Sequence, residues 1–160
     1  MHRALEDDRT GSRRVRVSFD DLAAGDELPP LARVVTREDV RAYAEVSGDP
    51  NPLHQDDAVA RAAGFPGIIA HGMFTMGHMA AAVVSWAGED AIVERLTAQF
   101  RAPVFMGEEI VAGGRVRSVD PAARTATVDL WVSVERDGRT EMPIRKGSAI
   151  VRLGGRDEPE

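Results

Sequence analysis

Between residues 62 and 88 the chain contains no Asp, Glu, Lys or Arg. Residues 72–86 of this stretch predict a helix that is apolar almost all round, and such a helix is expected to be buried on all its faces. Its uninterrupted apolar run is too short to cross a membrane, which takes about 20 residues. The helix must therefore be wrapped by other elements, and the rest of the chain has the pattern of strands.

The second half of the chain predicts an antiparallel sheet, because apolar and polar residues alternate along it. The sheet is expected to be a meander with a bend or bulge at Gly113-Gly114 and a hairpin turn at Asp137-Gly138. Its strands are predicted at residues 93–101, 109–119, 124–134 and 145–153, with shorter strands at 15–19 and 31–35. A curled antiparallel sheet around one buried helix is the economical packing, so the fold class is α+β. Open sheet edges would favour pairing with a second copy.

Residues 36–64 predict a helical segment that overhangs the sheet. Thr36 is placed to cap a helix that ends at Gly48, and acidic residues follow Thr36 in the first turn. A second, shorter helix is predicted over residues 57–63 and is closed by Gly64.

A stiff loop joins these two helices. Pro50 and Pro52 exclude a helix and push the residues before them, Asp49 and Asn51, towards extended geometry. The loop ends at His54, so it displays a carboxylate, an amide and an imidazole on a backbone with little freedom. An acid and a histidine held in this way are what general acid–base catalysis needs.

Composition excludes several classes of function. At 160 residues we expect one domain, residues 15–153, between a flexible arm (1–14) and a flexible tail (154–160). The net charge is −6 and no basic patch stands out, so nucleic-acid binding is not expected. The chain has no cysteine, which excludes disulfides and thiol catalysis. The acidic first residues do not form a signal peptide, so a cytoplasmic protein without membrane attachment is expected.

Less specific interpretations of these residues stay open. Asp49 precedes a proline, so a purely structural role as a turn cap is an alternative for it. A structural role is the alternative for His54 as well. A metal site from Asp49, His54 and His71 is disfavoured because no helical His-x-x-x-His pair is present. No metal is therefore expected. The methionines that begin at Met73 fit a core or an adaptable apolar wall better than a cofactor site.

Three motifs resemble the MaoC-like hydratases, the R-specific enoyl-CoA hydratases also called hydratase 2. Residues 43–54 read Tyr-Ala-Glu-Val-Ser-Gly-Asp-Pro-Asn-Pro-Leu-His, with Ala60 six residues further on. The other two are Ala-His-Gly-Met at 70–73 and Phe-Arg-Ala-Pro-Val-Phe-Met-Gly-Glu at 100–108. The resemblance covers roughly residues 18–153. It implies a hot-dog fold and the reversible hydration of trans-2-enoyl thioesters to (R)-3-hydroxyacyl thioesters, without a cofactor.

Carried over residue by residue, the resemblance implies that Asp49 and His54 are the catalytic pair and that Gly72 gives the oxyanion-binding amide. Amides in the first turn of a helix lack intrahelical partners, and the helix dipole makes that end positive, which suits this role. We expect Asn51 to support the loop, and His71 and Met73 to contact the substrate. His54 is the expected base towards water, and Asp49 is expected to handle the proton at C2.

The expected ligand is an acyl-CoA or acyl-carrier-protein thioester, and the expected assembly is a homodimer. A heterodimer with another hot-dog subunit is the alternative, because residues 75–77 also resemble the catalytic subunit of actinobacterial (3R)-hydroxyacyl-ACP dehydratases. Two other functions are alternatives: a non-catalytic or partner-dependent subunit of such a dehydratase, and a hot-dog thioesterase. The acyl chain length, the carrier, the direction of reaction and the arginines that bind the carrier phosphates stay open.

Overall fold

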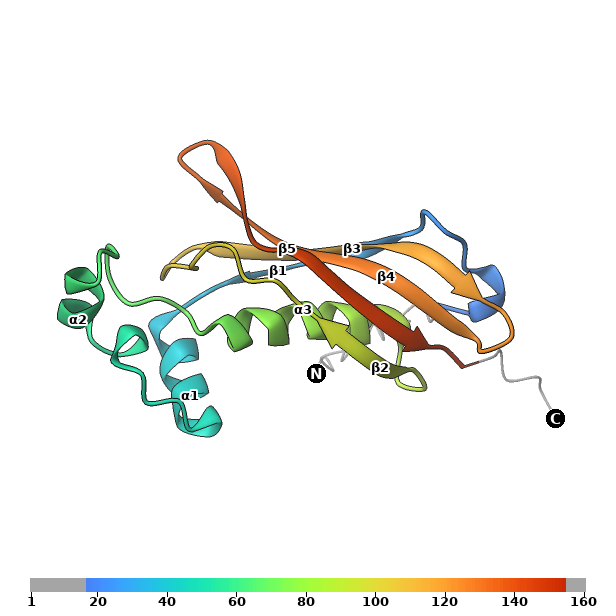
Figure 1. Cartoon of the computed structure of the whole chain (residues 1–160), viewed down its shortest axis with the longest axis horizontal. Helices are drawn as coiled ribbons and strands as arrows, with labels where there is room; N and C mark the ends of the chain where they lie inside the picture. Colours follow the sequence, from blue (N-terminus) through green and yellow to red (C-terminus); the bar gives the residue numbers. More distant parts are fainter. Residues whose placement is uncertain (1–16, 155–160) are drawn as a thin grey trace, which may run out of the picture.

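The computed structural model describes residues 17–154, in which one antiparallel sheet lies over a single long helix (Figure 1). The long helix is α3 (Gly72–Ala87), and the shorter helices α1 (Arg37–Ser47) and α2 (Asp57–Ala62) lie beyond one end of it. This confirms the expected α+β class. The arm at 1–14 and all but the first residue of the expected tail fall outside the described residues. Within them, no helix has both the length and the apolar character needed to cross a bilayer.

The sheet has five strands in the spatial order β1-β3-β4-β5-β2, and every neighbouring pair is antiparallel. Only β3, β4 and β5 follow one another as a meander, so the expected order was wrong for β2, which pairs with β5 and not with β3. The strands are β1 (Glu27–Val34), β2 (Ile92–Thr97), β3 (Glu109–Asp120), β4 (Thr125–Arg136) and β5 (Arg139–Arg152). The expected strand at 93–101 ends four residues early.

A bulge was expected in β3 at Gly113-Gly114, but it is found in the neighbouring strand β1. The ladder between β3 and β4 runs straight through both glycines, and the register shift lies in β1 between Leu28 and Leu31, where two prolines sit. Proline lacks an amide hydrogen and is tolerated in a sheet at an edge or a bulge, and β1 offers both. Gly113 is needed for a different reason, because a Cβ there would lie 2.7 Å from the indole nitrogen of Trp131.

Strand β5 contains two successive bulges. Its register with β4 gains one residue between Glu141 and Ile144 and another between Ile144 and Gly147. Bulges bend a strand and increase its twist, and the β4–β5 hairpin turns away from the sheet (Figure 1). The hairpin closes through Asp137 and Gly138, whose φ values of 51° and 71° match the expected two-residue turn. This strand starts six residues before the expected boundary at 145.

Helix α3 is buried on one side only, so the expectation of burial on all faces was wrong for the single chain. The face that contains Met79 and Val83 is fully buried against β1, β3, β4 and β5. On the opposite face Met73 is 55% exposed and Val84 is 53% exposed. The physical reason is that a single sheet covers one side of a helix, and the segment 98–108 does not reach the other side.

The ends of α1 follow the sequence signals. The Thr36 hydroxyl accepts a hydrogen bond from the Asp39 amide, and the Asp39 carboxylate accepts one from the Thr36 amide, which is a capping box. Gly48 ends the helix in the left-handed region with φ 69°. The expected strand at 15–19 is not found in its described part, where Phe19 begins a short 3-10 helix, Phe19–Asp21.

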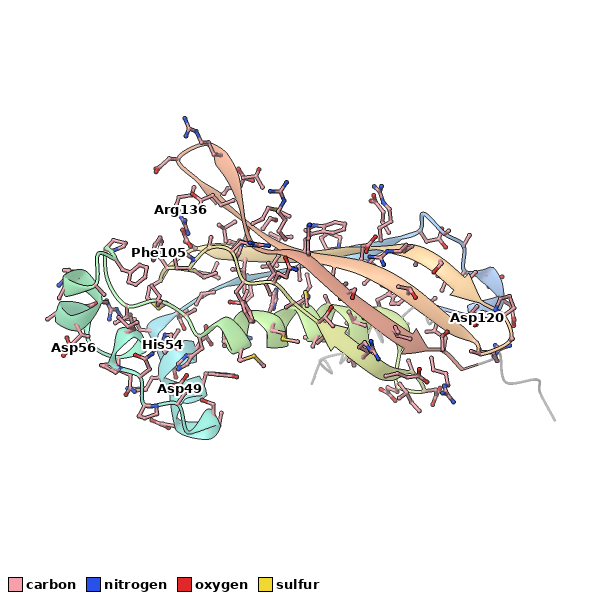
Figure 2. The ribbon with its side chains drawn as sticks, viewed as in Figure 1. Asp49, His54, Asp56, Phe105, Asp120 and Arg136 are labelled. Atoms are coloured by element: carbon pink, nitrogen blue, oxygen red, sulfur yellow. The ribbon has the colours of Figure 1, made fainter. Side chains whose placement is uncertain are left out.

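An ion pair joins the β4–β5 hairpin to the segment that precedes β3. Arg136 donates from Nε to Glu108 Oε1 at 2.6 Å, and from Nη2 to Glu108 Oε2 at 2.9 Å and to the Pro103 carbonyl at 3.1 Å. Glu108 also accepts from the Phe105 amide, and the guanidinium lies 4.4 Å from the centre of the Phe105 ring (Figure 2). These contacts tie residues 103–108 to the β4–β5 hairpin.

We expect Arg136→Met to lower the free energy of unfolding by about 2–3 kcal/mol, because it leaves the mostly buried Glu108 carboxylate without its partner. Arg117→Met is the matched control: Arg117 pairs with Asp129 on the same sheet, but both side chains are about half exposed, so the expected loss is under about 1 kcal/mol. Urea titration of the three proteins checks this. Equal losses in both variants would contradict the buried character of the Glu108 pair.

Candidate active site

The loop that carries Asp49 is held by its own side chains. The Asp49 carboxylate accepts a hydrogen bond from the Asn51 amide at 3.1 Å, and the Asn51 side-chain oxygen accepts one from the Leu53 amide at 3.1 Å. Asn51 thereby caps the short 3-10 helix Pro52–His54. The expected supporting role of Asn51 has this local hydrogen bond as its physical basis. Figure 2 shows Asp49 and His54 near each other, below the start of α3.

The orientation of His54 fixes its tautomer. Its Nδ1 lies 2.8 Å from the backbone carbonyl of Ile69, and the Ile69 amide donates to the Leu53 carbonyl. A carbonyl oxygen only accepts hydrogen bonds, so Nδ1 carries the proton in the neutral ring. Nε2 is then left with a free lone pair, which is the state a general base requires.

His71 lies directly behind His54. Its side chain is 2% exposed, and neither ring nitrogen has a hydrogen-bond partner in the described part of the chain. The ring stacks on His54 with centroids 3.7 Å apart and packs against Tyr43 at 4.9 Å. Burial lowers the pKa of His71 below its ordinary value, and the charge of a protonated His54 lowers it further, against the raising effect of Asp49. His71 is therefore a neutral ring at neutral pH.

Asp49, His54 and His71 form one cluster. The Asp49 Oδ2 and His71 Nε2 atoms are 4.0 Å apart, and one donor atom from each of the three residues lies within 4.8 Å of the others. These are the residues that would hold a metal ion. The two imidazole rings are stacked, however, with an angle of 29° between their planes, whereas the ligands of tetrahedral zinc approach the metal from different directions. The arrangement suits proton transfer better than metal ligation.

A cavity of about 340 Å³ opens next to His54 and is lined mainly by apolar groups. Gly72, Thr75, Phe100 and Val104 are among its walls. Gly72 begins α3, and no side chain caps this helix end, so the first-turn amides are available to a ligand. A Cβ at Gly72 would lie 3.3 Å from the Phe100 ring, which means that glycine keeps this wall clear.

The structure brings together Asp49, His54, Gly72 and His71, but it places Met73 apart. Met73 lies on the exposed face of α3 and does not line the cavity beside His54. The expected substrate contact of Met73 stays a prediction, and so does that of His71, whose ring is stacked on His54.

Sequence reasoning missed Thr75 and Phe100 as walls of this cavity. Phe100 belongs to the run at 100–108 that carried the family resemblance, so a signal for it was present. Thr75 lies in the run 75–77 that resembled the dehydratase subunit, so it had a signal too, but that resemblance did not indicate a cavity wall. It lies one turn after His71, and its hydroxyl approaches the His71 carbonyl at 3.5 Å.

The buried histidines predict acid sensitivity. Burial lowers the pKa of His71 and of His78, whose Nε2 lies 2.9 Å from the Leu31 carbonyl, below the ordinary value of 6.5. The unfolded chain therefore binds more protons than the folded one below that value, and stability falls with falling pH. We expect the melting temperature to be constant from pH 8 to 7 and to fall by several degrees between pH 6.5 and 5.5.

A variant checks the origin of this acid effect. His78→Gln keeps an N–H donor for the Leu31 carbonyl but does not titrate. It should make the fall of the melting temperature between pH 6.5 and 5.5 shallower, as measured by scanning calorimetry. A wild-type melting temperature that does not change over this range would show that neither histidine is held neutral.

Comparison with known proteins identifies the class of fold first. The R-hydratase PhaJ1 from Pseudomonas aeruginosa superimposes with a TM-score of 0.77 and 25% sequence identity, covering 88% of this chain and 87% of that one. The sheet laid over one long helix is thus a hot-dog fold, as the resemblance implied.

The family is defined by sequence as well. The family described as MaoC like domain matches residues 23–137, and the chain belongs to this family. A 3-hydroxybutyryl-CoA dehydratase from Methylorubrum extorquens is 30% identical over 144 residues, 89% of this chain and 87% of that protein. A mitochondrial 3-hydroxyacyl-[acyl-carrier-protein] dehydratase from Arabidopsis thaliana is 42% identical over 90 residues, which is 56% of this chain. That match spans about half of the Arabidopsis protein, 53% of its length.

Proposed function

We propose that the protein is a hydro-lyase that adds water to trans-2-enoyl thioesters to give (R)-3-hydroxyacyl thioesters, or catalyses the reverse dehydration. The observation that carries the proposal is the position of His54 between two other groups. Its ring clusters with the Asp49 carboxylate, and it lines the same cavity as Gly72 at the amide end of α3. The relatives named as dehydratases and the R-hydratase neighbour support the same reaction class.

The chemistry follows from the three groups. His54 Nε2 takes a proton from a water molecule as the oxygen of that water bonds to C3. The electron pair of the C2–C3 double bond moves to C2 and the thioester oxygen, where the amide at Gly72 stabilises the negative charge, a contribution worth about 3–4 kcal/mol per donor. The proton that His54 has gained is passed by way of Asp49 to C2, which completes the addition and leaves both side chains in their starting protonation states. The product therefore gains one hydroxyl group at C3 and one hydrogen at C2.

Two features suit this site to an acyl thioester. The walls at Phe100 and Val104 are apolar, which fits an acyl chain, and the Gly72 backbone is free of a side chain where a carbonyl oxygen would approach. His71 completes the design as a neutral ring behind His54, because a second positive charge at 3.7 Å would oppose protonation of the base.

The experiment that tests the function is the loss of the enoyl ultraviolet band from crotonyl-CoA, then from a longer enoyl-CoA, with wild-type protein and with Asp49→Asn. A loss that requires Asp49 and gives the (R)-3-hydroxy product would support the proposal. A folded wild-type protein that acts on no enoyl thioester, whether on coenzyme A or on an acyl carrier protein, would contradict it.

We also propose that the protein works as a dimer of two copies. The exposed apolar side chains Met73 and Val84 on α3 form, with Ile92 at the start of β2, the uncovered side of the helix layer. A second hot-dog domain of the same kind would bury them. Native mass spectrometry of the purified protein gives the answer: a homodimer supports the proposal, and a monomer at micromolar concentration contradicts it.

A further inference from the structure

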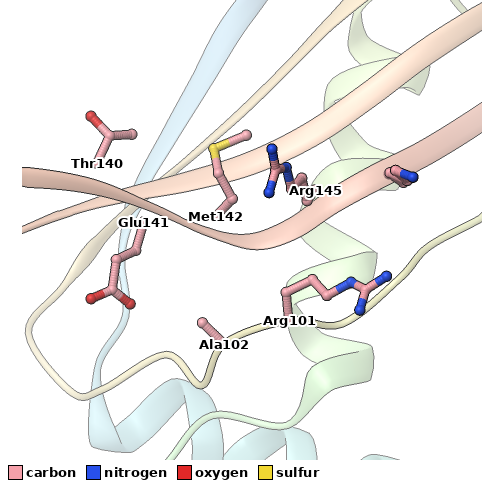
Figure 3. A pocket seen from close by; sticks show the side chains of 7 residues that line it. Arg101, Ala102, Thr140, Glu141, Met142 and Arg145 are labelled. Carbon is pink, nitrogen blue, oxygen red and sulfur yellow. The ribbon is translucent and has the colours of Figure 1, made fainter.

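A second cavity of about 640 Å³ lies between strand β5 and the chain segment that follows β2 (Figure 3). It is lined by Arg101 and Ala102 on one side and by residues 140–142, 145 and 146 of β5 on the other. We call it the hairpin groove. The second bulge of β5 lies between Ile144 and Gly147 and contains the two basic residues of the groove, Arg145 and Lys146. Bulges are common next to functional sites, where they redirect side chains.

The hairpin groove carries positive charge that no acid neutralises. Arg101, Arg145 and Lys146 have exposed side chains and form no ion pair within the described residues. The Arg101 guanidinium donates to the side-chain oxygen of Gln99, a neutral group, at 2.6 Å. The one acid in the groove, Glu141, is already paired with Arg136. This cluster is unusual in a chain with a net charge of −6, and it includes the only lysine of the sequence.

The hairpin groove is continuous with the cavity beside His54. Arg101 and Ala102 line both of them, and Pro143 of the first cavity directly follows Met142 of the second along β5. The Arg101 amide donates to the Pro143 carbonyl at 2.8 Å, which holds the two segments together at the junction. A ligand whose reacting end lies at His54 therefore reaches the hairpin groove by way of Arg101, which lines both cavities.

We propose that the hairpin groove binds the phosphate end of the pantetheine carrier, with Arg101, Arg145 and Lys146 as the phosphate-binding residues. This inference rests on the proposed function, because it places the thioester in the cavity beside His54. Pantetheine itself is uncharged, whereas both possible carriers, coenzyme A and an acyl carrier protein, attach it to phosphate. Arg and Lys are the side chains that bind phosphate with charge-assisted hydrogen bonds.

The test compares carriers. We would measure KM for crotonyl-CoA, crotonyl-acyl-carrier protein and crotonyl-pantetheine, which lacks the phosphate, with wild-type protein and with the double variant Arg145→Gln/Lys146→Gln. The quantity of interest is the ratio of the KM of a phosphate-bearing substrate to the KM of crotonyl-pantetheine. We expect this ratio to be about tenfold higher in the double variant than in the wild type, and the difference to be smaller at high salt. Arg95→Gln on β2, which removes an exposed arginine outside the groove, is the matched control and should leave this ratio unchanged.

The outcomes distinguish coenzyme A from an acyl carrier protein as the carrier, and they distinguish failure of the groove from failure of the proposed function. A higher ratio for crotonyl-CoA alone, or for the carrier protein alone, supports the groove and names the carrier. An unchanged ratio for both overturns the inference. If no thioester is converted, the proposed function fails, and calorimetric titration with free coenzyme A then decides the groove by itself. Binding that the double variant weakens about tenfold supports the groove, and binding that is absent or unaffected overturns it.

Discussion

A glutamine in place of His54 is expected to lower kcat for hydration of an enoyl thioester by about 10³-fold while the protein stays folded. Glutamine retains an N–H group for the Ile69 carbonyl, so the loop keeps its anchor, but it has no basic nitrogen to receive a proton from water. The measurement is single-turnover kinetics together with the melting temperature. Gln55→Ala, which removes an exposed side chain one residue away, is the control and should keep the wild-type kcat.

Comparison with Asp49→Asn tests how the two residues divide the proton transfers. His54 takes a proton from water, whereas Asp49 passes a proton to C2. His54→Gln and Asp49→Asn should therefore differ in residual rate, in solvent isotope effect and in the shape of the pH–rate profile. Equal residual rates and identical pH profiles for both variants would refute the assignment of His54 to water and Asp49 to C2.

The second large effect is expected at Gly72. Gly72→Val should lower kcat by about 10²-fold, because its side chain meets the Phe100 ring, which a Cβ alone would already approach at 3.3 Å, and crowds the helix end where the oxyanion forms. The loss should appear in kcat more than in KM, because the charge on the oxygen exists only in the transition state.

Gly77→Ala on the same helix provides the control for Gly72→Val. No atom lies within 4 Å of a Cβ at Gly77, and alanine is favoured over glycine inside a helix by about 1 kcal/mol. This variant should be slightly more stable than wild type and equally active. If Gly72→Val were as active as Gly77→Ala, the oxyanion role of the α3 amides would be wrong.

The loop of the candidate site was predictable because its information is local. Pro50 and Pro52 restrict their own backbone and that of Asp49 and Asn51, whatever the rest of the chain does. The capping of α1 by Thr36 is local as well. The stacking of His71 on His54 was not predictable, because it depends on how α3 is placed against a loop 17 positions earlier in the chain.

The sheet was predicted as strands but not as a topology. Alternation marks a strand without naming its neighbour, so nothing in β2 itself indicates that it pairs with β5. The first part of β5 was missed because Pro143 normally excludes a strand, and here it lies where the register shifts between Glu141 and Ile144. Likewise, the apolar pattern of α3 indicates that the helix is buried, but it does not indicate whether residues of the same chain or of a second chain bury each face.

The two prolines in β1 also make the two edges of the sheet differ in their ability to pair with a strand of another chain. The exposed edge strands are β1 and β2, and β1 interrupts its outer row of amides with Pro29 and Pro30, so no foreign strand finds a regular ladder there. The other edge is six residues long and carries Glu94 and Arg95. A newly synthesised molecule therefore presents little that could seed fibrils or end-to-end aggregates, and protection against uncontrolled polymerisation is built into the same strand that closes the sheet over α3.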